Sequence, residues 1–325
     1  MKEAYLSAKF IEKADFFRAQ FTDRANFYGA WFAKIVELHE TYLKEALFTK
    51  ARFKHADFYK TQFANKADFS EIESTTESDH PRLDFHNVQF DVPEHITFLK
   101  DNLSEASFVN TDVTRVRFGE DVIWGDKFKI REEREIGNQL KTKNSATDIQ
   151  RGDVLAVYRN LRENYEFRMR YDEAGEFFIR EMEISRLYRQ DTKNGQTQIR
   201  RNDWVTRNLS FIGLYHFFSK YGQSVFRPFI LGIGIVILST LLWSIQQNAA
   251  EEFIFHNTNV SQIVNSSNLQ IAFERSLTNF LPSLSFGTEL NVGLLDVAVK
   301  LVGGAVTFGL FIIALRRKFE RKFRH

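Results

Sequence analysis

Large apolar residues recur every five positions through much of the first half of the chain. One run of this kind extends from Leu38 to Phe63 and a second from Phe98 to Ile123, while Phe10 to Leu38 alternates steps of six and five. An α-helix repeats its apolar face at about 3.6 residues and a strand at 2, so a step of five fits neither. We therefore expect a chain that turns a corner every five residues, buries one large side chain per side and stacks its coils on one another.

A small residue often stands two places before the large one. The triplets that show this are Ala14-Asp15-Phe16, Ala19-Gln20-Phe21, Ala25-Asn26-Phe27, Ala51-Arg52-Phe53, Ala56-Asp57-Phe58 and Ala67-Asp68-Phe69. On these triplets the chain, over about residues 4–124, resembles the pentapeptide-repeat family, whose members form a right-handed quadrilateral β-helix. The resemblance implies that each Phe or Leu points inward and that the small residue packs beside it. We predict this β-helix (a β-solenoid) over residues 1–126, with a loop inserted at Ser70 to Asp84.

Helix-forming sequence replaces the five-residue step after residue 126. The apolar spacing predicts a helical connector over residues 127–202, with two helices separated by a break at Tyr171 to Gly175 and then a flexible turn at Gln190 to Gln198. The next segment mixes many aromatic residues with a few basic ones, a composition typical of a helix lying in the membrane interface. We place this interfacial helix at residues 203–224.

Two uncharged apolar stretches follow, Phe229 to Ile245 and Leu301 to Leu315. About 20 apolar residues are needed to cross the hydrocarbon core, so we predict spans at about residues 226–246 and 296–316 of a transmembrane pore domain at 225–325. The second span includes Lys300, which can extend to the headgroups and lies four residues after Asp296, a spacing that favours an ion pair. A buried hairpin in a soluble domain is the alternative.

The segment between the two predicted spans is too long and too patterned for a simple turn. Leu269 to Leu281 is amphipathic and stops at Pro282, which predicts a half-helix over about residues 269–282 that re-enters the bilayer. Irregular backbone at membrane depth has to be buried by protein or to line a water-filled cavity. We predict that the residues after the half-helix line a pore: Ser283, Leu284, Ser285, Phe286 and Gly287.

Over about residues 224–318 the chain resembles the two-transmembrane, pore-loop potassium-channel family. That family's filter pattern, Thr-Val-Gly-Tyr-Gly, lies over Ser283 to Gly287, and its inner-helix pattern of Gly, two residues, Ser or Thr, Phe, Gly and Leu lies over Gly304 to Leu310. The resemblance implies a bend or gate in the inner helix, although ordinary packing of small residues between helices is the alternative reading. The residues of this hinge are Gly304, Thr307, Phe308 and Gly309.

Two departures from the family pattern change the predicted ion selectivity. Ser285 stands where the filter has its first glycine, whose unusual backbone dihedrals a side chain resists, and Phe286 lacks the tyrosine hydroxyl. A broader cation pore, permeable to monovalent cations, is therefore predicted instead of a potassium-selective one. Glu289, just outside the filter, either concentrates cations as a ring in an oligomer or lies as a carboxylate at headgroup level.

Charge decides the predicted topology. Basic residues crowd the end of the second predicted span, from Arg316 to Arg324, whereas residues 246–291 hold only Arg275. By the positive-inside rule both termini face the cytoplasm. The N-terminal segment also lacks the apolar core of a secretory signal. We expect a multi-pass protein of the cell membrane with its β-helix in the cytoplasm.

Composition argues against several other classes of protein. The chain has no cysteine, which removes disulfides and thiol catalysis, and His39, His55, His80, His86 and His95 have no metal-ligand spacing. Paired carboxylates occur in the connector, but neither a catalytic nucleophile nor a phosphate-binding loop accompanies them, so we expect no enzyme, no metal and no cofactor. Residues 1–126 carry a net charge of −6 with basic residues interspersed, a weak version of the field that DNA mimicry needs. We expect no nucleic acid partner.

The sequence therefore predicts a multidomain membrane protein with a β-helix, a helical connector and a two-span pore domain. Such a domain encloses a pathway only as a homo-oligomer, most simply a tetramer in the lipid bilayer. The predicted function is passive ion conduction, with the β-helix as a scaffold or gating element. The alternative is a membrane-anchored scaffold in which the hairpin tethers the β-helix and a cytoplasmic protein partner binds it.

Overall fold

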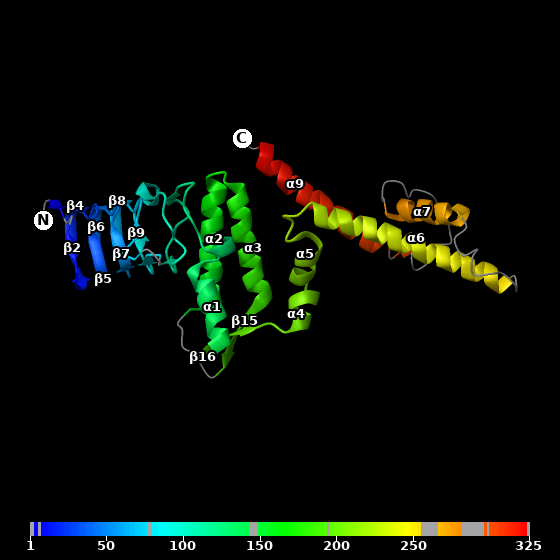
Figure 1. Cartoon of the computed structure of the whole chain (residues 1–325), viewed down its shortest axis with the longest axis horizontal. Coiled ribbons are helices and arrows are strands. Elements are labelled where there is room, and N and C mark those ends of the chain that lie inside the picture. The colour runs from blue at the N-terminus through cyan, green and yellow to red at the C-terminus, as the bar shows by residue number, and fades with distance from the viewer. Residues whose placement is uncertain are drawn as a thin grey trace. The chain divides into compact units, whose positions relative to one another are not determined.

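A computed structural model shows the chain as two compact units, Met1–Arg207 and Asn208–His325 (Figure 1). It describes residues 3–5, 8–76, 80–142, 149–193, 196–254, 266–280, 296–297 and 299–323. The first unit contains a β-solenoid followed by helices and a hairpin, and the second contains helices. Each unit is treated by itself below.

The first unit begins with a parallel β-solenoid of about five turns, consistent with the predicted pentapeptide-repeat β-helix. Its strands in the described residues form two seven-stranded sheets, in which strands from successive turns pair in parallel. The strands are β1 (Glu3–Tyr5), β2 (Lys9–Phe10), β3 (Ala14–Asp15), β4 (Gln20–Asn26), β5 (Trp31–Glu37), β6 (Tyr42–Leu47), β7 (Arg52–Asp57), β8 (Gln62–Asp68), β9 (Glu73–Ser74), β10 (Arg82–Asp84), β11 (Gln89–Phe90), β12 (Ile96–Phe98), β13 (Ala106–Ser107) and β14 (Arg117–Phe118).

Tight turns separate the strands, and the residue pattern explains why they form. In the turn after β4, the Ala30 N–H donates to the Phe27 carbonyl and Gly29 has φ of 64°, as the third residue of a type II turn requires. Elsewhere lysine or glutamate takes this position; Lys60, for example, has φ of 55°. The polar residue of each triplet also contributes: the Asp57 carboxylate accepts the Tyr59 N–H and so supports the next turn.

Stacked phenylalanine rings fill the solenoid, as the resemblance implied. Phe27 stacks on Phe48 with 4.8 Å between ring centroids, Phe48 on Phe69 with 5.0 Å, and Phe69 on Phe98 with 4.9 Å. All four side chains are fully buried. The rings repeat at about the spacing of neighbouring strands, so each turn of the solenoid buries its side chains against the turns next to it.

The predicted loop at Ser70 to Asp84 is shorter in the structure. Both β9 and β10 pair with β7, so the two ends of this segment still belong to the solenoid. Ile72 and Leu83 are buried there. The prediction was wrong at these ends because apolar residues at two positions suffice to keep a turn of the solenoid, even where the surrounding composition is polar.

Three helices follow the solenoid: α1 (Arg131–Thr142), α2 (Arg151–Phe167) and α3 (Tyr171–Leu187). The last turn of a solenoid exposes carbonyl groups that no further strand can bond. Polar side chains near the end of α2 and just after it satisfy them: Asn164 donates to the carbonyls of Val113 and Val116, and Arg168 to that of Val116. The aromatic core continues into these helices, because Tyr165 stacks on Phe118.

The connector differs from its prediction in three ways. It has three helices where two were expected, and the break falls at residues 168–170, since Tyr171 already belongs to α3. The expected flexible turn at Gln190 to Gln198 lies mostly within an antiparallel hairpin, β15 (Tyr188–Lys193) paired with β16 (Gln196–Arg201). The predicted interfacial helix is divided into α4 (Trp204–Leu209) and α5 (Phe211–Ser219), because Ser210 caps α5 by accepting the Gly213 N–H.

The second unit consists mainly of α6 (Phe226–Ile254), α7 (Ser266–Phe280), a π-helix (Val299–Phe308) and α9 (Gly309–Phe323). Among the described residues one helix is apolar over a length that can cross a membrane, at Phe226–Ile245. The apolar helical stretch Val306–Arg316 is shorter. The first predicted span therefore has a matching helix, whereas the second predicted span is not confirmed.

A substitution in the ring stack tests the solenoid core. We expect Phe69→Ala to lower the free energy of unfolding by about 3–5 kcal/mol, because it leaves a cavity between Phe48 and Phe98. Guanidinium unfolding of the detergent-solubilised chain, followed by circular dichroism, measures the change. Phe17→Ala is the control, since that ring is 52% exposed and its removal should cost little. Equal effects of the two substitutions would contradict the stacked core.

Asp101 predicts a pH dependence of stability. Burial raises the pKa of this carboxyl to about 8, although the Ile72 N–H donates to it. The unfolded chain therefore ionises before the folded chain does, and the wild type should lose stability as pH rises from about 4 to about 8. Relative to Asp101→Asn the loss should reach roughly 5 kcal/mol, because a pKa difference of about four units corresponds to about 1.4 kcal/mol per unit. Unfolding curves across this pH range measure it, with the exposed Asp112→Asn as control; parallel curves for wild type and Asp101→Asn would refute the assignment.

Candidate functional site

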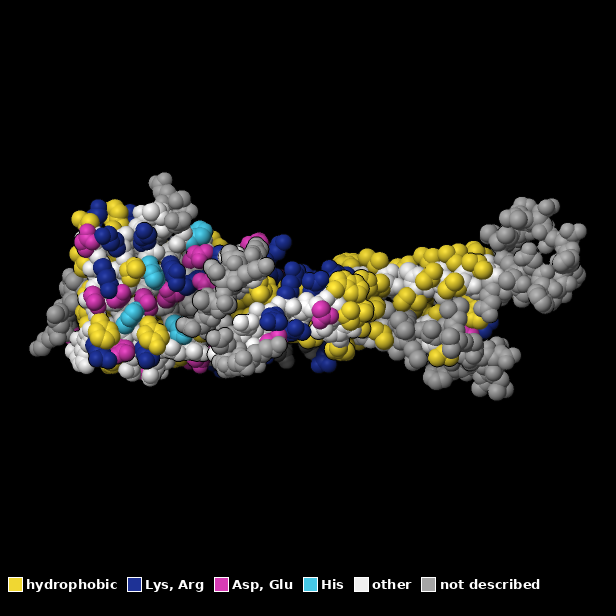
Figure 2. Space-filling model, turned by 90° about the horizontal axis from the view of Figure 1, so that it is seen from below, with side chains coloured by type: hydrophobic (Ala, Val, Ile, Leu, Met, Phe, Trp, Pro, Cys, Tyr) yellow, Lys and Arg dark blue, Asp and Glu magenta, His cyan; other side chains and the backbone are white. Residues whose placement is uncertain are grey.

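Helix α6 buries several small polar residues together with Val236 and Trp243, and it exposes most of its large apolar ones. Ser239, Thr240 and Ser244 are buried, and the hydroxyls of Ser239 and Thr240 both donate to the Val236 carbonyl within the helix. Large apolar side chains cover the exposed side: Phe229, Ile230, Ile233, Ile237, Leu238, Leu241, Leu242 and Ile245. Figure 2 shows this hydrophobic surface along the helices of the unit. This exposed apolar surface is compatible with membrane association.

Helix α7 repeats this arrangement and packs against α6. Its buried positions Ala272, Ser276 and Asn279 recur at helical spacing, while Ile271 and Phe273 are exposed. α7 contacts both α6 and the π-helix, so it lies against two helices that are far apart in the sequence. α7 thus covers most of the residues predicted for the half-helix, and its buried positions include polar side chains; its re-entry into the bilayer stays a prediction.

The predicted hinge lies where the π-helix ends and α9 begins. Thr307 is buried, Phe308 is 39% exposed, and Gly309 is the first residue of α9. Gly304 lies within the π-helix. A π-helical stretch inside an α-helix often marks a functional position, and here it coincides with the glycine-containing segment that the resemblance singled out.

An apolar pocket of about 400 Å³ lies between α6, α7 and the helix that includes Thr307. Its wall includes Phe229, Ile233, Leu277 and Phe311. Gly232 of α6 makes close packing possible beside it, because a Cβ atom there would lie 2.7 Å from the Phe280 ring. The pocket has almost no polar surface, so it suits an apolar chain and not an ion.

A charged cluster joins the three helical segments at one point. Arg275 of α7 donates to both carboxylate oxygens of Asp296, at 3.3 and 2.8 Å. The Asn279 amide also donates to Asp296. The Arg275 guanidinium lies over the Trp243 ring of α6, 3.7 Å from its centroid. The sequence had suggested Lys300 as the partner of Asp296; the partners found here come from α7, which spacing along one helix could not reveal.

The predicted filter cannot be placed. Ser283 to Gly287 and Glu289 lie outside the described residues. What the structure describes is the two sides of this segment: α7 up to Phe280 before it, and Asp296 after it. The predicted filter and hinge residues are therefore not brought together by the described part of the chain.

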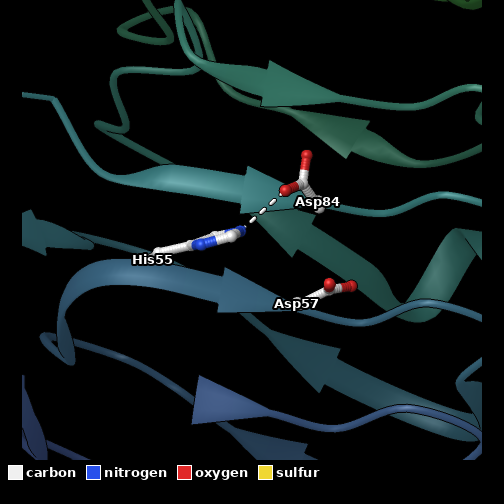
Figure 3. Close-up of side chains that lie close together, drawn as sticks. All are labelled: His55, Asp57 and Asp84. Carbon is white, nitrogen blue, oxygen red and sulfur yellow. Dashed lines mark hydrogen bonds and ion pairs between the residues drawn. The ribbon is translucent and has the colours of Figure 1, made fainter. Parts of the chain in front are cut away.

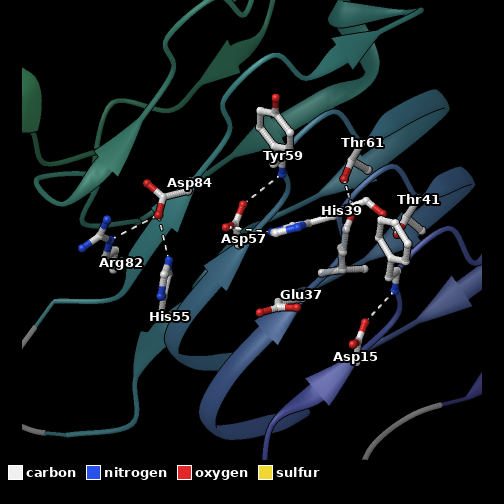
Figure 4. Close-up of polar contacts among 12 residues, drawn as sticks. Asp15, Glu37, His39, Thr41, His55, Asp57, Tyr59, Thr61, Arg82 and Asp84 are labelled. Atoms are coloured by element: carbon white, nitrogen blue, oxygen red, sulfur yellow. Dashed lines mark hydrogen bonds and ion pairs between the residues drawn. The ribbon is translucent and has the colours of Figure 1, made fainter. Parts of the chain in front are cut away.

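The solenoid carries a second polar cluster, on one of its faces (Figure 4). In-register pairing aligns Asp15, Glu37, Asp57 and Asp84 on successive strands. Like charges on neighbouring strands repel, and cationic or neutral donors separate them. These contacts are Lys13 to Glu37 at 2.7 Å, His39 to Asp57 at 2.8 Å and His55 to Asp84 at 2.7 Å.

His55, Asp57 and Asp84 offer ligand atoms within 4.8 Å of one another, a spacing that could suit a metal ion (Figure 3). The contacts of Asp84 favour a different assignment. Burial alone would raise its pKa, but hydrogen bonding from His55 and the guanidinium groups of Arg131 and Arg82 bring the pKa well below its usual range. Both oxygens of Asp84 are thereby engaged with cationic or donor groups. We assign the cluster as an ion-pair network that ties α1 to the solenoid.

The histidines have no metal-ligand spacing in the sequence, but His55 lies on β7 and binds Asp84 at a separation of 29 positions. The sequence contained a signal for this contact. One turn of the solenoid takes about 20 residues, and the inserted segment lengthens the turn after His55, so Asp84 lies on the strand that pairs with β7.

Comparison with known proteins adds little to this description. No family model matches the chain, and no solved structure matches it. An uncharacterized protein of Methanocaldococcus jannaschii is 28% identical over 254 residues, which cover 73% of this chain and 49% of that protein. The chain thus spans about half the length of the curated relative it matches. The name of that relative states no activity.

Two glycines of α6 provide a matched test of the packing between α6 and α7. We expect Gly232→Ala to lower the free energy of unfolding of the detergent-solubilised protein by about 1–3 kcal/mol, and hence its melting temperature, since the new methyl group would overlap the Phe280 ring. Gly234→Ala should have no such effect, because nothing lies within 4 Å of a Cβ atom there. Thermal unfolding monitored by circular dichroism compares the two, and equal melting temperatures would contradict this packing.

Proposed function

We propose that this protein is the subunit of an oligomeric cation channel in a cell membrane. The proposal rests on one observation above all: the second unit buries several hydroxyl, amide and charged side chains between its helices and exposes many large apolar ones. Ser239, Ser276, Asn279, Asp296 and Thr307 are all buried in it. Isoleucine, leucine and phenylalanine side chains cover its exposed helix faces. Lipid satisfies such an exterior, whereas water does not.

The order of the helices supports conduction more specifically. The long apolar helix α6 is followed by the shorter α7, which packs back onto α6 and onto the π-helix. The pore-loop resemblance implies this order: a long helix, a short helix, a polar segment and then a second long helix that contains glycines. In this proposal residues 283–287 line the pathway and four subunits enclose it, with both termini in the cytoplasm.

The solenoid would act as a rigid cytoplasmic element. Its C-terminal turns are bonded to α1 and α2 through side chains, including the Asp84–Arg131 pair and the Asn164 amide. α1 in turn is tied to α3, because Glu133 binds Arg180 at 3.1 Å. A force or ligand acting on the solenoid would reach the connector through these contacts, which is how the proposal accounts for gating.

A membrane-anchored scaffold without conduction is the second candidate. One described helix is long and apolar enough to span, which is all that an anchor needs. The solenoid also exposes the aromatic rings of Phe17 and Tyr28. Figure 2 shows charged side chains of both signs interspersed with hydrophobic ones on one of its faces, a surface suited to a protein partner. Conduction through the purified protein separates the two candidates.

The test is flux through purified protein in liposomes and planar bilayers. We expect cation current that is absent from protein-free membranes, and a mass in detergent of about four chains by light scattering. Ser285→Trp should abolish the current if residues 283–287 line the pathway, because a large ring would fill it. Ile230→Trp is the matched control: this side chain is 65% exposed on α6, so current should persist.

Absence of current under any cation gradient, together with a monomeric mass, would overturn the channel proposal. Membrane association with no current would leave the anchored scaffold. Current that survives Ser285→Trp unchanged would remove residues 283–287 from the pathway.

A further inference from the structure

The first turn of α1 places four consecutive charged residues beside the C-terminal turns of the solenoid. Three of them have partners from neighbouring elements: Arg131 binds Asp84, Glu133 binds Arg180 and Tyr158, and Arg134 binds Glu105 at 2.7 Å. Glu132 is the exception. It is 2% exposed, and neither of its carboxylate oxygens has a hydrogen-bond partner among the described residues.

Glu132 lies where α1 covers the polar column of the solenoid. In-register pairing places Ser107 of β13 beside Asp84 of β10, so this buried serine occupies the next position after the aligned carboxylates. The Ser107 hydroxyl acts on the Glu132 carboxyl and favours its charged form. Arg131, the neighbour of Glu132 in the sequence, is already bound to Asp84 and so compensates that carboxylate instead.

The charged groups around Glu132 do not offset the cost of burying it. Arg131 favours the ionised carboxylate, whereas Glu135 on the next turn of α1 opposes it. Strand β16 also contacts α1, but its two arginines, Arg200 and Arg201, are exposed. Burial is the largest effect, and it raises the pKa of Glu132 to about 7.

An ionised carboxylate without a partner is costly away from water, so the docked position of α1 favours the neutral acid. We infer that Glu132 is a proton-operated latch: α1 stays docked on the solenoid while this carboxyl is protonated, and the docking weakens when the carboxyl ionises. The latch belongs to the first unit alone, so it does not depend on ion conduction. It makes the contact between the solenoid and its helical connector sensitive to pH.

Opening of α1 should therefore increase with pH. The Glu132 carboxyl has its ordinary pKa of 4.5 when α1 is open and a pKa of about 7 when α1 is docked. The opening equilibrium is constant below the first value, rises between the two and levels off above the second. Between pH 6 and pH 8 the opened fraction should rise about tenfold.

The first experiment uses a cysteine probe, since the chain contains no cysteine. Ile136 is fully buried one turn after Glu132 on the same face of α1, so Ile136→Cys reports opening of the helix through its reaction with a maleimide. The labelling rate of the folded full chain in detergent is divided by that of the same chain unfolded in guanidinium at each pH. We expect this ratio to rise about tenfold from pH 6 to pH 8. Adding Glu132→Gln should remove the rise.

Two controls separate the latch from other effects of pH. Asp101→Asn in the Ile136→Cys chain should leave the rise intact, although burial also raises the pKa of Asp101. Leu161→Cys, fully buried on α2, should be labelled more slowly than Ile136→Cys at pH 8, because it reacts only when α2 opens as well. An equal rise with and without Glu132→Gln overturns the latch. Equal labelling of the two cysteines also overturns it, since the whole unit would then unfold and not α1 alone.

A second measurement needs no cysteine. Guanidinium unfolding of the full chain compares wild type with Glu132→Gln at pH 6 and pH 8. The unfolding equilibrium constant of the wild type should rise about tenfold relative to that of Glu132→Gln. Glu163→Gln is the matched control, since Glu163 is exposed on α2, and it should follow the wild type. Curves for wild type and Glu132→Gln that shift in parallel overturn the latch even if the cysteine variants do not fold.

Discussion

Stacking of successive turns is the interaction on which the first unit depends. A single five-residue side of the solenoid buries little by itself, since each Phe ring stacks face to face on a ring of the next turn. Backbone groups follow the same logic, because the strands pair only with strands of neighbouring turns. Such a structure needs an end that supplies partners from outside the repeat. Helix α2 does this through Asn164, and α1 adds the ion pair from Arg131 to Asp84.

Regular stacking also brings like charges together, and the structure shows how this is tolerated. In-register pairing places Asp57 beside Asp84 and Glu37 beside Asp57. His39 and His55 each bind one of these carboxylates, so the repulsion between them is reduced. The repeat itself therefore produces this polar face. His55, Asp57 and Asp84 form part of an ion-pair network and not a metal site, because the guanidinium groups of Arg82 and Arg131 already bind Asp84.

The second unit follows the opposite solvent preference. Its interior holds hydroxyl, amide and charged groups, and its exterior holds large apolar side chains. The hydroxyls of Ser239 and Thr240 donate to a backbone carbonyl of their own helix, whereas the Asp296 carboxylate accepts from Arg275 of α7. The serines and threonines are therefore compatible with simple helix packing, whereas the Arg275–Asp296 pair joins α7 to a residue 21 positions later in the chain.

The sequence by itself determined the solenoid, because a five-residue period leaves few other ways to bury one ring per step, and it located α6 and α7 by apolar length and amphipathic spacing. Only the tertiary structure decided the contacts between distant positions. His55 meets Asp84, and Asp296 meets Arg275, because these contacts depend on which helix or strand packs alongside. The hairpin of β15 and β16 was not predicted for a related reason. Both segments are polar, so their composition does not indicate strands, and they form a sheet because they pair with each other.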